Sequence, residues 1–233
     1  DRGAARLATG KWFNAGQTCI APDYVLLVGR ERRDALVREL RAQVAARYGR
    51  LDDGARDYSR IINDGQFARL QGYLDEARAR GCDFVNISPV RDDLPEEAGA
   101  EWLALVPNTD TALMLGMAHT LLAQGLHDAG FIARCRSGWV EFEAYLTGRA
   151  DGVAKTADWA AAICGLPAAT IAGLARRMAG KRSLIAMAHS LQRAEHGEQP
   201  VWMAGVLAAM LGQIGLPGGG YNYALGAIGH YGR

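Results

Sequence analysis

Residues 102–122 have the sequence WLALVPNTDTALMLGMAHTLL, and this stretch decides the fold. The first five residues form a short apolar run, which is typical of a strand. Residues 107–110 (PNTD) form a polar turn that suits the start of a helix, and the apolar residues after it predict a helix that closes near Gly125. A strand that leads through a short turn into a helix is the building unit of α/β proteins.

The same alternation continues on both sides of this stretch. Further strands are predicted at residues 24–28, 83–87 and 183–187; helices are predicted at residues 30–48, from Asn63 or Asp64 to Gly81, after the cap Thr156, around Pro167, and at residues 199–213. Because strands alternate with helices, we expect an α/β fold with a mostly parallel sheet and flanking helices. We expect residues 102–106 and 183–187 to share that sheet, and the part before residue 85 to pack beside it or add strands.

The composition excludes several classes of protein. Of the 233 residues, 49% are hydrophobic and 22% are charged, which is ordinary for a globular chain. A net charge of +1 gives no field that would attract nucleic acid, so no such partner is expected. The longest apolar run, residues 201–211, is far shorter than the ~20 residues of a membrane-spanning helix, and we expect a core helix there and no membrane span. The four cysteines form no C-x-x-C pair, which argues against structural zinc and a disulfide framework.

Cys19 lies in a glycine-containing turn just before the strand predicted at residues 24–28. A thiol at such a turn is close to backbone N–H groups, which can stabilise a thiolate and a neighbouring oxyanion. A buried structural cysteine is the alternative, because cysteine is among the most buried residue types and no histidine base stands nearby. The residues alone leave both interpretations open.

The segment around this cysteine, residues 10–25 (GKWFNAGQTCIAPDYV), resembles the catalytic-cysteine segment of NAD(P)-dependent aldehyde dehydrogenases, especially the coniferyl aldehyde dehydrogenase branch. The resemblance covers about residues 1–84. It implies that Cys19 is the nucleophile that attacks an aldehyde, with NAD(P) as the hydride acceptor. The general-base Glu, the oxyanion-hole Asn and the nucleotide-binding domain of that family lie upstream of the matching segment, so we expect an unfinished site.

Two loops in the second part follow predicted strands at their carboxyl ends, where open α/β sheets bind ligands. The first contains Ser88 and Arg91, and the second contains Asn108 and Asp110. An aspartate at the start of a helix either accepts two N–H donors from a guanine edge or caps its own helix, and the pattern alone favours the cap. Residues 217–220 (PGGG) allow a close approach of the backbone to a ligand, although such a run more often marks a loop.

Taken together, several stretches of the second part resemble the bis-molybdopterin guanine dinucleotide oxidoreductases, in the S-oxide and N-oxide reductase branch. The matching stretches are residues 86–91 (NISPVR), 107–115 (PNTDTALML), 118–121 (AHTL), 152–156 (GVAKT), 159–161 (WAA), 190–199 (SLQRAEHGEQ) and 207–220 (LAAMLGQIGLPGGG). The resemblance covers about residues 85–225. It implies a Rossmann-like domain that holds one molybdopterin guanine dinucleotide.

The resemblance also implies roles for the residues at the strand ends. Ser88 and Arg91 are expected near the ribose and phosphates, and Asn108 and Asp110 at the guanosine end. Much of the wider superfamily has Asp-Pro where this chain has Ser88-Pro89, which weakens the expected ribose contact.

Three further residues are expected on the pterin and substrate side. Gln192 is expected to approach the pterin, and Arg193 corresponds to a substrate-pocket position where a guanidinium can hydrogen-bond an S=O or N–O oxygen. His189 stands where this branch usually has Trp, and it either faces the substrate or packs at a strand end. The Ser that ligates molybdenum lies in an upstream stretch, so no metal ligand is assigned.

The sequence therefore predicts two parts, residues 1–84 from an aldehyde dehydrogenase and residues 85–233 from a molybdopterin oxidoreductase. The two families abut without a Gly, Ser or Pro linker, and we interpret the chain as a fusion or truncation that joins interior pieces of larger bacterial enzymes. The leading hypothesis is a part of an S- or N-oxide reductase that is inactive alone. The alternatives are an aldehyde dehydrogenase and a non-catalytic nucleotide-binding or inert α/β module. A small-molecule S-oxide, N-oxide or aldehyde is the expected substrate class. The sequence does not define the oligomeric state. It also leaves open whether the protein lies in the bacterial cytoplasm or in the periplasm.

Overall fold

The computed structural model describes residues 2–16, 21–22, 25–29, 31–49, 58, 63–134 and 137–223. The chain forms two compact units, Asp1–Cys82 and Asp83–Arg233. The boundary predicted at residue 84 divides the chain by the family that each part resembles. The origin of the two parts from two different enzymes stays a prediction.

The regular elements described in the first unit are all helical. They are α1 (Arg2–Trp12), the 3₁₀ turn η1 (Phe13–Gly16), α2 (Glu31–Tyr48) and α3 (Asp64–Ala79). Arg47 of α2 donates hydrogen bonds to the Thr9 hydroxyl (2.5 Å) and the Ala5 carbonyl (3.1 Å) of α1, which joins these two helices. The amide of Gln66 donates to the Asn63 side chain (2.9 Å), so Asn63 is the predicted cap of α3.

The prediction of a strand at residues 24–28 is wrong for residues 25–28, which the structure describes. Residues 25–28 form no strand, and the side chains of Leu26 and Val28 are both 88% exposed. A short β-rich run becomes a strand only where a neighbouring strand takes up its backbone hydrogen bonds, and no such neighbour is described in this unit.

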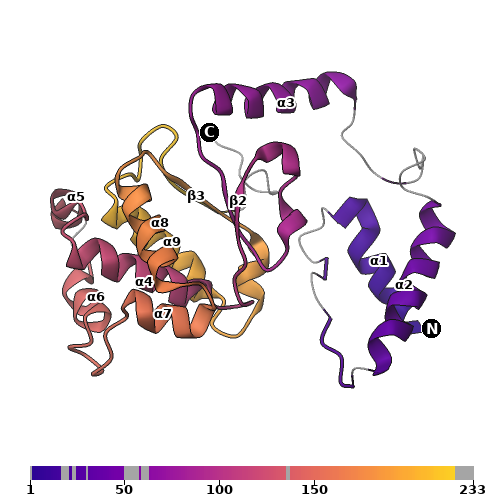
Figure 1. The fold of residues 1–233 in the computed structure, drawn as a ribbon, viewed down its shortest axis with the longest axis horizontal. Helices are drawn as coiled ribbons and strands as arrows, with labels where there is room; N and C mark the ends of the chain where they lie inside the picture. The colour runs from indigo at the N-terminus through magenta and orange to yellow at the C-terminus, as the bar shows by residue number, and fades with distance from the viewer. Residues whose placement is uncertain are drawn as a thin grey trace. The chain divides into compact units, whose positions relative to one another are not determined.

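The second unit has an α/β fold, as predicted, and two parallel sheets lie within its described residues (Figure 1). β1 (Val85–Ile87) pairs with β2 (Glu101–Leu103), and β3 (Leu184–Met187) pairs with β4 (Gly220–Tyr223). The helices are α4 (Asp110–Ala123), α5 (Ala129–Arg134), α6 (Trp139–Leu146), α7 (Ala157–Cys164), α8 (Ala168–Ala179) and α9 (Glu198–Met210). The described residues of this unit also form the 3₁₀ turns η3 (Arg91–Asp93), η4 (Glu96–Ala98) and η5 (His189–Arg193).

The prediction that residues 102–106 and 183–187 share one sheet is wrong, because β2 and β3 lie in different sheets. The partner of β3 is β4, a strand that the sequence did not indicate because it begins at Gly220 after a run of glycines. The buried side chain of Gln213 holds this pairing in place. It accepts a hydrogen bond from the Ser183 amide (2.6 Å) and donates to the Lys181 carbonyl (2.9 Å), so the chain leading to β4 is fixed beside the start of β3.

Helix α4 is the centre of the hydrophobic core. It packs against α7, α8 and α9, and it buries residues on nearly every face, including Leu113, Met117 and Leu121. Gly116 permits the close approach of α7, because a Cβ at this position would lie 2.6 Å from the Cβ of Ala160. A helix that is apolar all round is expected to be buried, which is what the structure shows.

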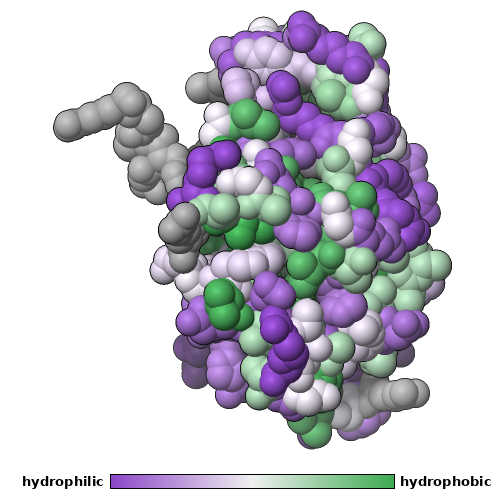
Figure 2. All heavy atoms as spheres, turned by 90° about the vertical axis from the view of Figure 1, so that its left-hand side faces the viewer, coloured by the Kyte–Doolittle hydropathy of each residue, from purple (hydrophilic) through white to green (hydrophobic). Residues whose placement is uncertain are grey.

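The surface of the second unit is mixed. Figure 2 faces the side that carries α5 and α6, and apolar residues lie there in small groups among hydrophilic ones, as on ordinary protein surfaces. No single described helix is long and apolar enough to cross a membrane. The pair α7 and α8, bent by 117°, passes the length and composition criteria together, and both helices contribute to the core.

Candidate functional site: the carboxyl edge of the first sheet

Two polar loops leave the same edge of the β1/β2 sheet. The register pairs Ile87 with Leu103, so these parallel strands end side by side, and the Ser88 amide donates a hydrogen bond to the Leu103 carbonyl (3.3 Å). The first loop begins at Ser88, and the chain after β2 continues to the start of α4 at Asp110. The structure therefore brings out both predicted loops at the carboxyl edge, which is where open α/β sheets bind ligands.

The first loop is held by hydrogen bonds to its own side chains. The Ser88 hydroxyl donates to the Asp93 carboxylate and accepts from the Val90 amide (3.0 Å). The buried Asn86 side chain donates to the Arg91 carbonyl (3.0 Å), and the Trp102 indole donates to the Ser88 carbonyl (2.9 Å). Each of these bonds removes freedom from the loop, so its conformation is fixed without a ligand.

Ser88 and Arg91 differ in what they offer to a ligand. The Ser88 side chain is buried and already has two partners inside the loop. Arg91 is exposed, and no side-chain partner of its guanidinium is found among the described residues. Of the two residues predicted to lie near ribose and phosphates, only Arg91 presents an open charged group.

The second loop begins α4 with an unusual backbone conformation. Asn108 has a φ of 64°, in the left-handed region that asparagine tolerates better than most residues. Thr109 follows and donates through both its amide (3.3 Å) and its hydroxyl (2.6 Å) to the Val106 carbonyl, so this hydroxyl does not cap the helix. The turn is therefore closed by Val106 and Thr109, and Asp110 is the first residue of α4.

Asp110 is a half-buried carboxylate at the start of α4. Burial raises the pKa of its carboxyl above the ordinary value, and its own backbone N–H partly offsets this increase. Among the described residues no cation and no other side-chain donor pairs with it. A carboxylate that is partly desolvated and unpaired gains stability from any N–H donors that reach it.

The residues predicted on the pterin and substrate side lie after β3. Gln192 and Arg193 belong to the 3₁₀ turn η5, and both side chains are exposed. His189 begins this turn, but its side chain lies outside the described part of the structure. Gly197 is buried, and a Cβ there would lie 2.2 Å from the Gln192 carbonyl oxygen, so glycine allows η5 to fold closely onto the start of α9.

Cys19, the nucleophile predicted in the first unit, lies outside the described residues. The structure describes the residues of α1 and η1 before it and residues 21–22 after it. Its role as a nucleophile stays a prediction.

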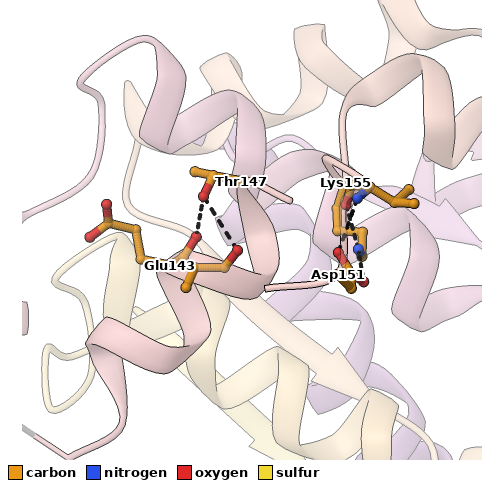
Figure 3. Close-up of polar contacts among 6 residues, drawn as sticks. Glu143, Thr147, Asp151 and Lys155 are labelled. Atoms are coloured by element: carbon orange, nitrogen blue, oxygen red, sulfur yellow. Dashed lines mark hydrogen bonds and ion pairs between the residues drawn. The ribbon is translucent and has the colours of Figure 1, made fainter. Parts of the chain in front are cut away.

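A buried lysine is the clearest residue that the sequence reasoning missed. The Lys155 side chain is 3% exposed, and its ammonium donates to the Asp151 carboxylate (2.6 Å) and the Val153 carbonyl (2.5 Å) (Figure 3). It also lies 4.2 Å from the ring centre of Tyr145 and 5.7 Å from that of Trp159. Two of its three N–H donors are used within the fold and two aromatic rings lie beside it, so Lys155 is interpreted as a structural residue. The sequence contained a signal for this residue, because Lys155 lies within residues 152–156 (GVAKT), one of the stretches that resemble the molybdopterin oxidoreductases.

Histidine, cysteine and carboxylate side chains do not gather into a metal site in the described ranges. Burial lowers the pKa of His119, which lies on α4. The chemistry that the described residues support is the binding of a polar ligand at a sheet edge, through the carboxylate of Asp110 and the guanidinium of Arg91.

Comparison with known proteins identifies the family of the chain. The model of the molybdopterin oxidoreductase family matches residues 68–229, which is more than half of the chain. The chain therefore belongs to the molybdopterin oxidoreductase family, which uses a molybdenum–pterin cofactor. The model of the aldehyde dehydrogenase family matches residues 1–97, so both resemblances expected from the sequence are confirmed.

Similar proteins with names of the S- and N-oxide reductase type cover most of this chain. Biotin sulfoxide reductase of Cereibacter sphaeroides is 49% identical over 163 residues, which are 70% of this chain and 22% of the relative. Dimethyl sulfoxide/trimethylamine N-oxide reductase of the same organism is 50% identical over 162 residues, 70% of this chain and 19% of the relative. Trimethylamine-N-oxide reductase of Haemophilus influenzae is 46% identical over 160 residues, which are 67% of this chain and 19% of the relative. The chain spans about a fifth of the length of these relatives.

A solved structure is similar in fold to part of this chain. Acetylene hydratase from Pelobacter acetylenicus aligns with a TM-score of 0.50 at 26% identity, over 61% of this chain and 19% of that one.

Proposed function

We propose that this chain is part of a molybdopterin-dependent S- or N-oxide reductase, and that its second unit binds the guanine end of a molybdopterin guanine dinucleotide. The observation that carries the proposal is the near 50% identity with reductases of this type over 70% of the chain. The loops at the carboxyl edge of β1 and β2 support it, because such edges bind nucleotides in open α/β folds.

The residues of this edge fit a guanine nucleotide chemically. Guanine presents adjacent N–H donors on one edge, and the Asp110 carboxylate is a half-buried acceptor without a side-chain donor in the described structure. Asn108 lies two residues before it in the same turn and adds an amide. Arg91 offers a guanidinium for phosphates, and Ser88 contributes through the loop that it holds together.

The pterin and substrate side is assigned to η5. Gln192 and Arg193 are exposed there, so an amide and a guanidinium are available to a ligand, and His189 belongs to the same turn. The bound cofactor would supply two-electron redox chemistry at molybdenum. In this proposal Arg193 orients an S-oxide or N-oxide by donating hydrogen bonds to its oxygen, and Gln192 contacts the pterin.

Calorimetric titration of the chain with GDP and ADP tests the guanine site. The parent protein is expected to prefer GDP, and Asp110→Asn and Asp110→Ala are expected to lose about 1.5 to 3 kcal/mol of GDP affinity while ADP binding stays unchanged. Asp92→Asn is the matched control, because Asp92 is an exposed acid in the neighbouring loop. Equal GDP affinity in all variants, or none in the parent, would contradict the cofactor assignment and leave an inert α/β module.

The match to the aldehyde dehydrogenase model supports a second candidate function for the first unit. In this proposal Cys19 would attack an aldehyde, and NAD(P) when bound would supply the hydride acceptor. A thiol reagent should label Cys19 in the parent and not in Cys19→Ser, and Cys82→Ser is the control because Cys82 is an exposed cysteine. We expect no aldehyde oxidation with NAD(P) by this chain, and measurable turnover would overturn the expectation of an unfinished site.

A further inference from the structure

We propose that Asp93 is the residue that selects a ribose over a deoxyribose at the nucleotide site. The inference rests on the proposed guanine nucleotide site and adds a residue for which no role is predicted from the sequence. Two observations support it: the conformation of the loop after β1, and the position of the Asp93 carboxylate within that loop.

The loop that carries Asp93 starts at a fixed point. The Ser88 amide and carbonyl are both bonded to β2, to the Leu103 carbonyl (3.3 Å) and the Trp102 indole (2.9 Å) respectively. The far end of the loop is also tied down, since the Asn86 side chain of β1 donates to the Arg91 carbonyl (3.0 Å). Asp93 thus follows a segment of chain that is anchored to both strands of the sheet.

The Asp93 side chain is itself oriented within this loop. Its Oδ2 accepts the Ser88 hydroxyl proton, and Ser88 is in turn fixed by the Val90 amide (3.0 Å). The side chain is exposed, and no partner of its Oδ1 is found within the described ranges. An acceptor that is already oriented loses little conformational entropy when a ligand binds, so it favours a ligand that can donate to it.

The chemistry of this position fits a ribose diol better than a phosphate. A carboxylate repels phosphate oxygens, whereas the 2′- and 3′-hydroxyls of a ribose donate hydrogen bonds to it. Acidic side chains accept ribose hydroxyls at the carboxyl edge of other doubly wound α/β sheets. Arg91, two residues earlier in the same 3₁₀ turn, places the opposite charge nearby for the phosphates. One short turn therefore carries an acceptor for the sugar and a donor for the phosphates.

Calorimetric titration with GDP and 2′-deoxy-GDP tests the assignment. The parent is expected to bind GDP about tenfold more tightly than 2′-deoxy-GDP, because one hydrogen bond to a charged group is lost with the 2′-hydroxyl. Asp93→Ala should bind the two nucleotides equally. Asp93→Asn should bind GDP less than about threefold more tightly than 2′-deoxy-GDP. Asp92→Ala is the matched control, since it removes the same charge from the adjacent exposed position and should keep the tenfold ratio. Circular dichroism checks that each variant is folded.

The outcomes separate this inference from the proposal on which it rests. If the parent binds GDP and 2′-deoxy-GDP equally, or if Asp93→Ala keeps the tenfold ratio, the role of Asp93 is overturned while guanine binding stands. If the parent binds GDP no better than ADP, the guanine site is overturned instead. Support requires that Asp93→Ala lose the ribose preference and retain the preference for GDP over ADP that is assigned to Asp110.

Discussion

The two units both contain helices but differ in how much of each helix is buried. In the first unit, α2 and α3 have no fully buried residue, and α1 buries only Ala4 and Ala8. In the second unit, α4 alone buries nine residues, and it lies at the centre of a continuous core. This difference shows that an apolar stripe predicts a helix, whereas the stripe becomes part of a core only where other elements of the fold pack against it.

The largest expected difference between the units comes from shortening a leucine. Leu121 of α4 is fully buried, and Leu121→Ala should lower the free energy of unfolding by about 2 to 5 kcal/mol, because it removes buried methyl groups and leaves a cavity. Leu40 of α2 is only half-buried, and Leu40→Ala should cost less than about 1 kcal/mol. Urea unfolding followed by circular dichroism measures both variants. A cost for Leu40→Ala as large as for Leu121→Ala would show that the first unit has a core of its own.

The next comparison concerns two ion pairs with the same spacing and length. Lys155 and Asp151 of the second unit, and Arg80 and Glu76 of the first, are both four residues apart and 2.6 Å in length. Lys155→Ala should cost about 2 to 3 kcal/mol, because it removes a desolvated cation from its hydrogen bonds and from two aromatic rings.

The first-unit pair serves as the control. The Arg80 side chain is 74% exposed, and Arg80→Ala should cost no more than about 0.5 kcal/mol. Adding 1 M NaCl should weaken the Arg80 pair and leave the Lys155 effect nearly unchanged, since buried charges are screened less. Similar costs for both substitutions would contradict the difference in burial on which this prediction is based.

Two helical glycines are expected to respond to alanine in opposite directions. Gly116→Ala in α4 should destabilise the protein by about 1 to 3 kcal/mol, because the new methyl group would lie 2.6 Å from the Cβ of Ala160. Gly72 of α3 has no heavy atom within 4 Å of a Cβ built on it, and Gly72→Ala should stabilise the helix by about 0.5 to 1 kcal/mol. The thermal unfolding midpoints of the two variants should therefore move apart, and a stabilised Gly116→Ala would mean that α4 and α7 are not in close contact.

Local signals in the sequence were sufficient for α2, α3, α4, α7, α8 and α9, whereas no helix was predicted where α1, α5 and α6 lie. The cap at Asn63, the stop near Gly81 and the start of α4 at Asp110 lie where short-range rules place them, since capping involves residues within one turn. The sheets were harder because strand pairing is nonlocal. No sequence pattern shows that β3 pairs with β4, because the buried Gln213 that joins them lies far from Ser183 in sequence.

The candidate site was predictable to a similar extent. The two loops at the sheet edge follow from the rule that parallel strands end together, and both loops lie there. The bond between Ser88 and Asp93 was not predictable, because it depends on the exact turn that Pro89 and Val90 make. Lys155 was overlooked because lysine is rarely buried, and only its aromatic and carboxylate partners make that burial possible.

The smallest expected effect compares two aspartates at the first position of a helix, Asp110 of α4 and Asp64 of α3. Burial raises the pKa of Asp110 above the ordinary 3.8, so the folded protein holds this proton more tightly than the unfolded chain. The charged form of Asp110 therefore costs stability at neutral pH, and the cost disappears as the pH falls through the folded pKa toward 3.8. Asp110→Asn should raise the thermal midpoint at pH 7 by a small amount, and the gain should shrink at pH 4.

Asp64 is the control because it is exposed, so its charge interacts with the helix N-terminus without a burial cost. Asp64→Asn should lower stability at pH 7 by about 0.3 to 1 kcal/mol, which is opposite in sign to the effect at Asp110. If Asp110→Asn instead lowers stability at pH 7, as Asp64→Asn does, Asp110 acts as an ordinary helix-capping acid. If Asp110→Asn stabilises the free chain and weakens GDP binding, the sequence retains at this position a charge that costs stability and serves a ligand.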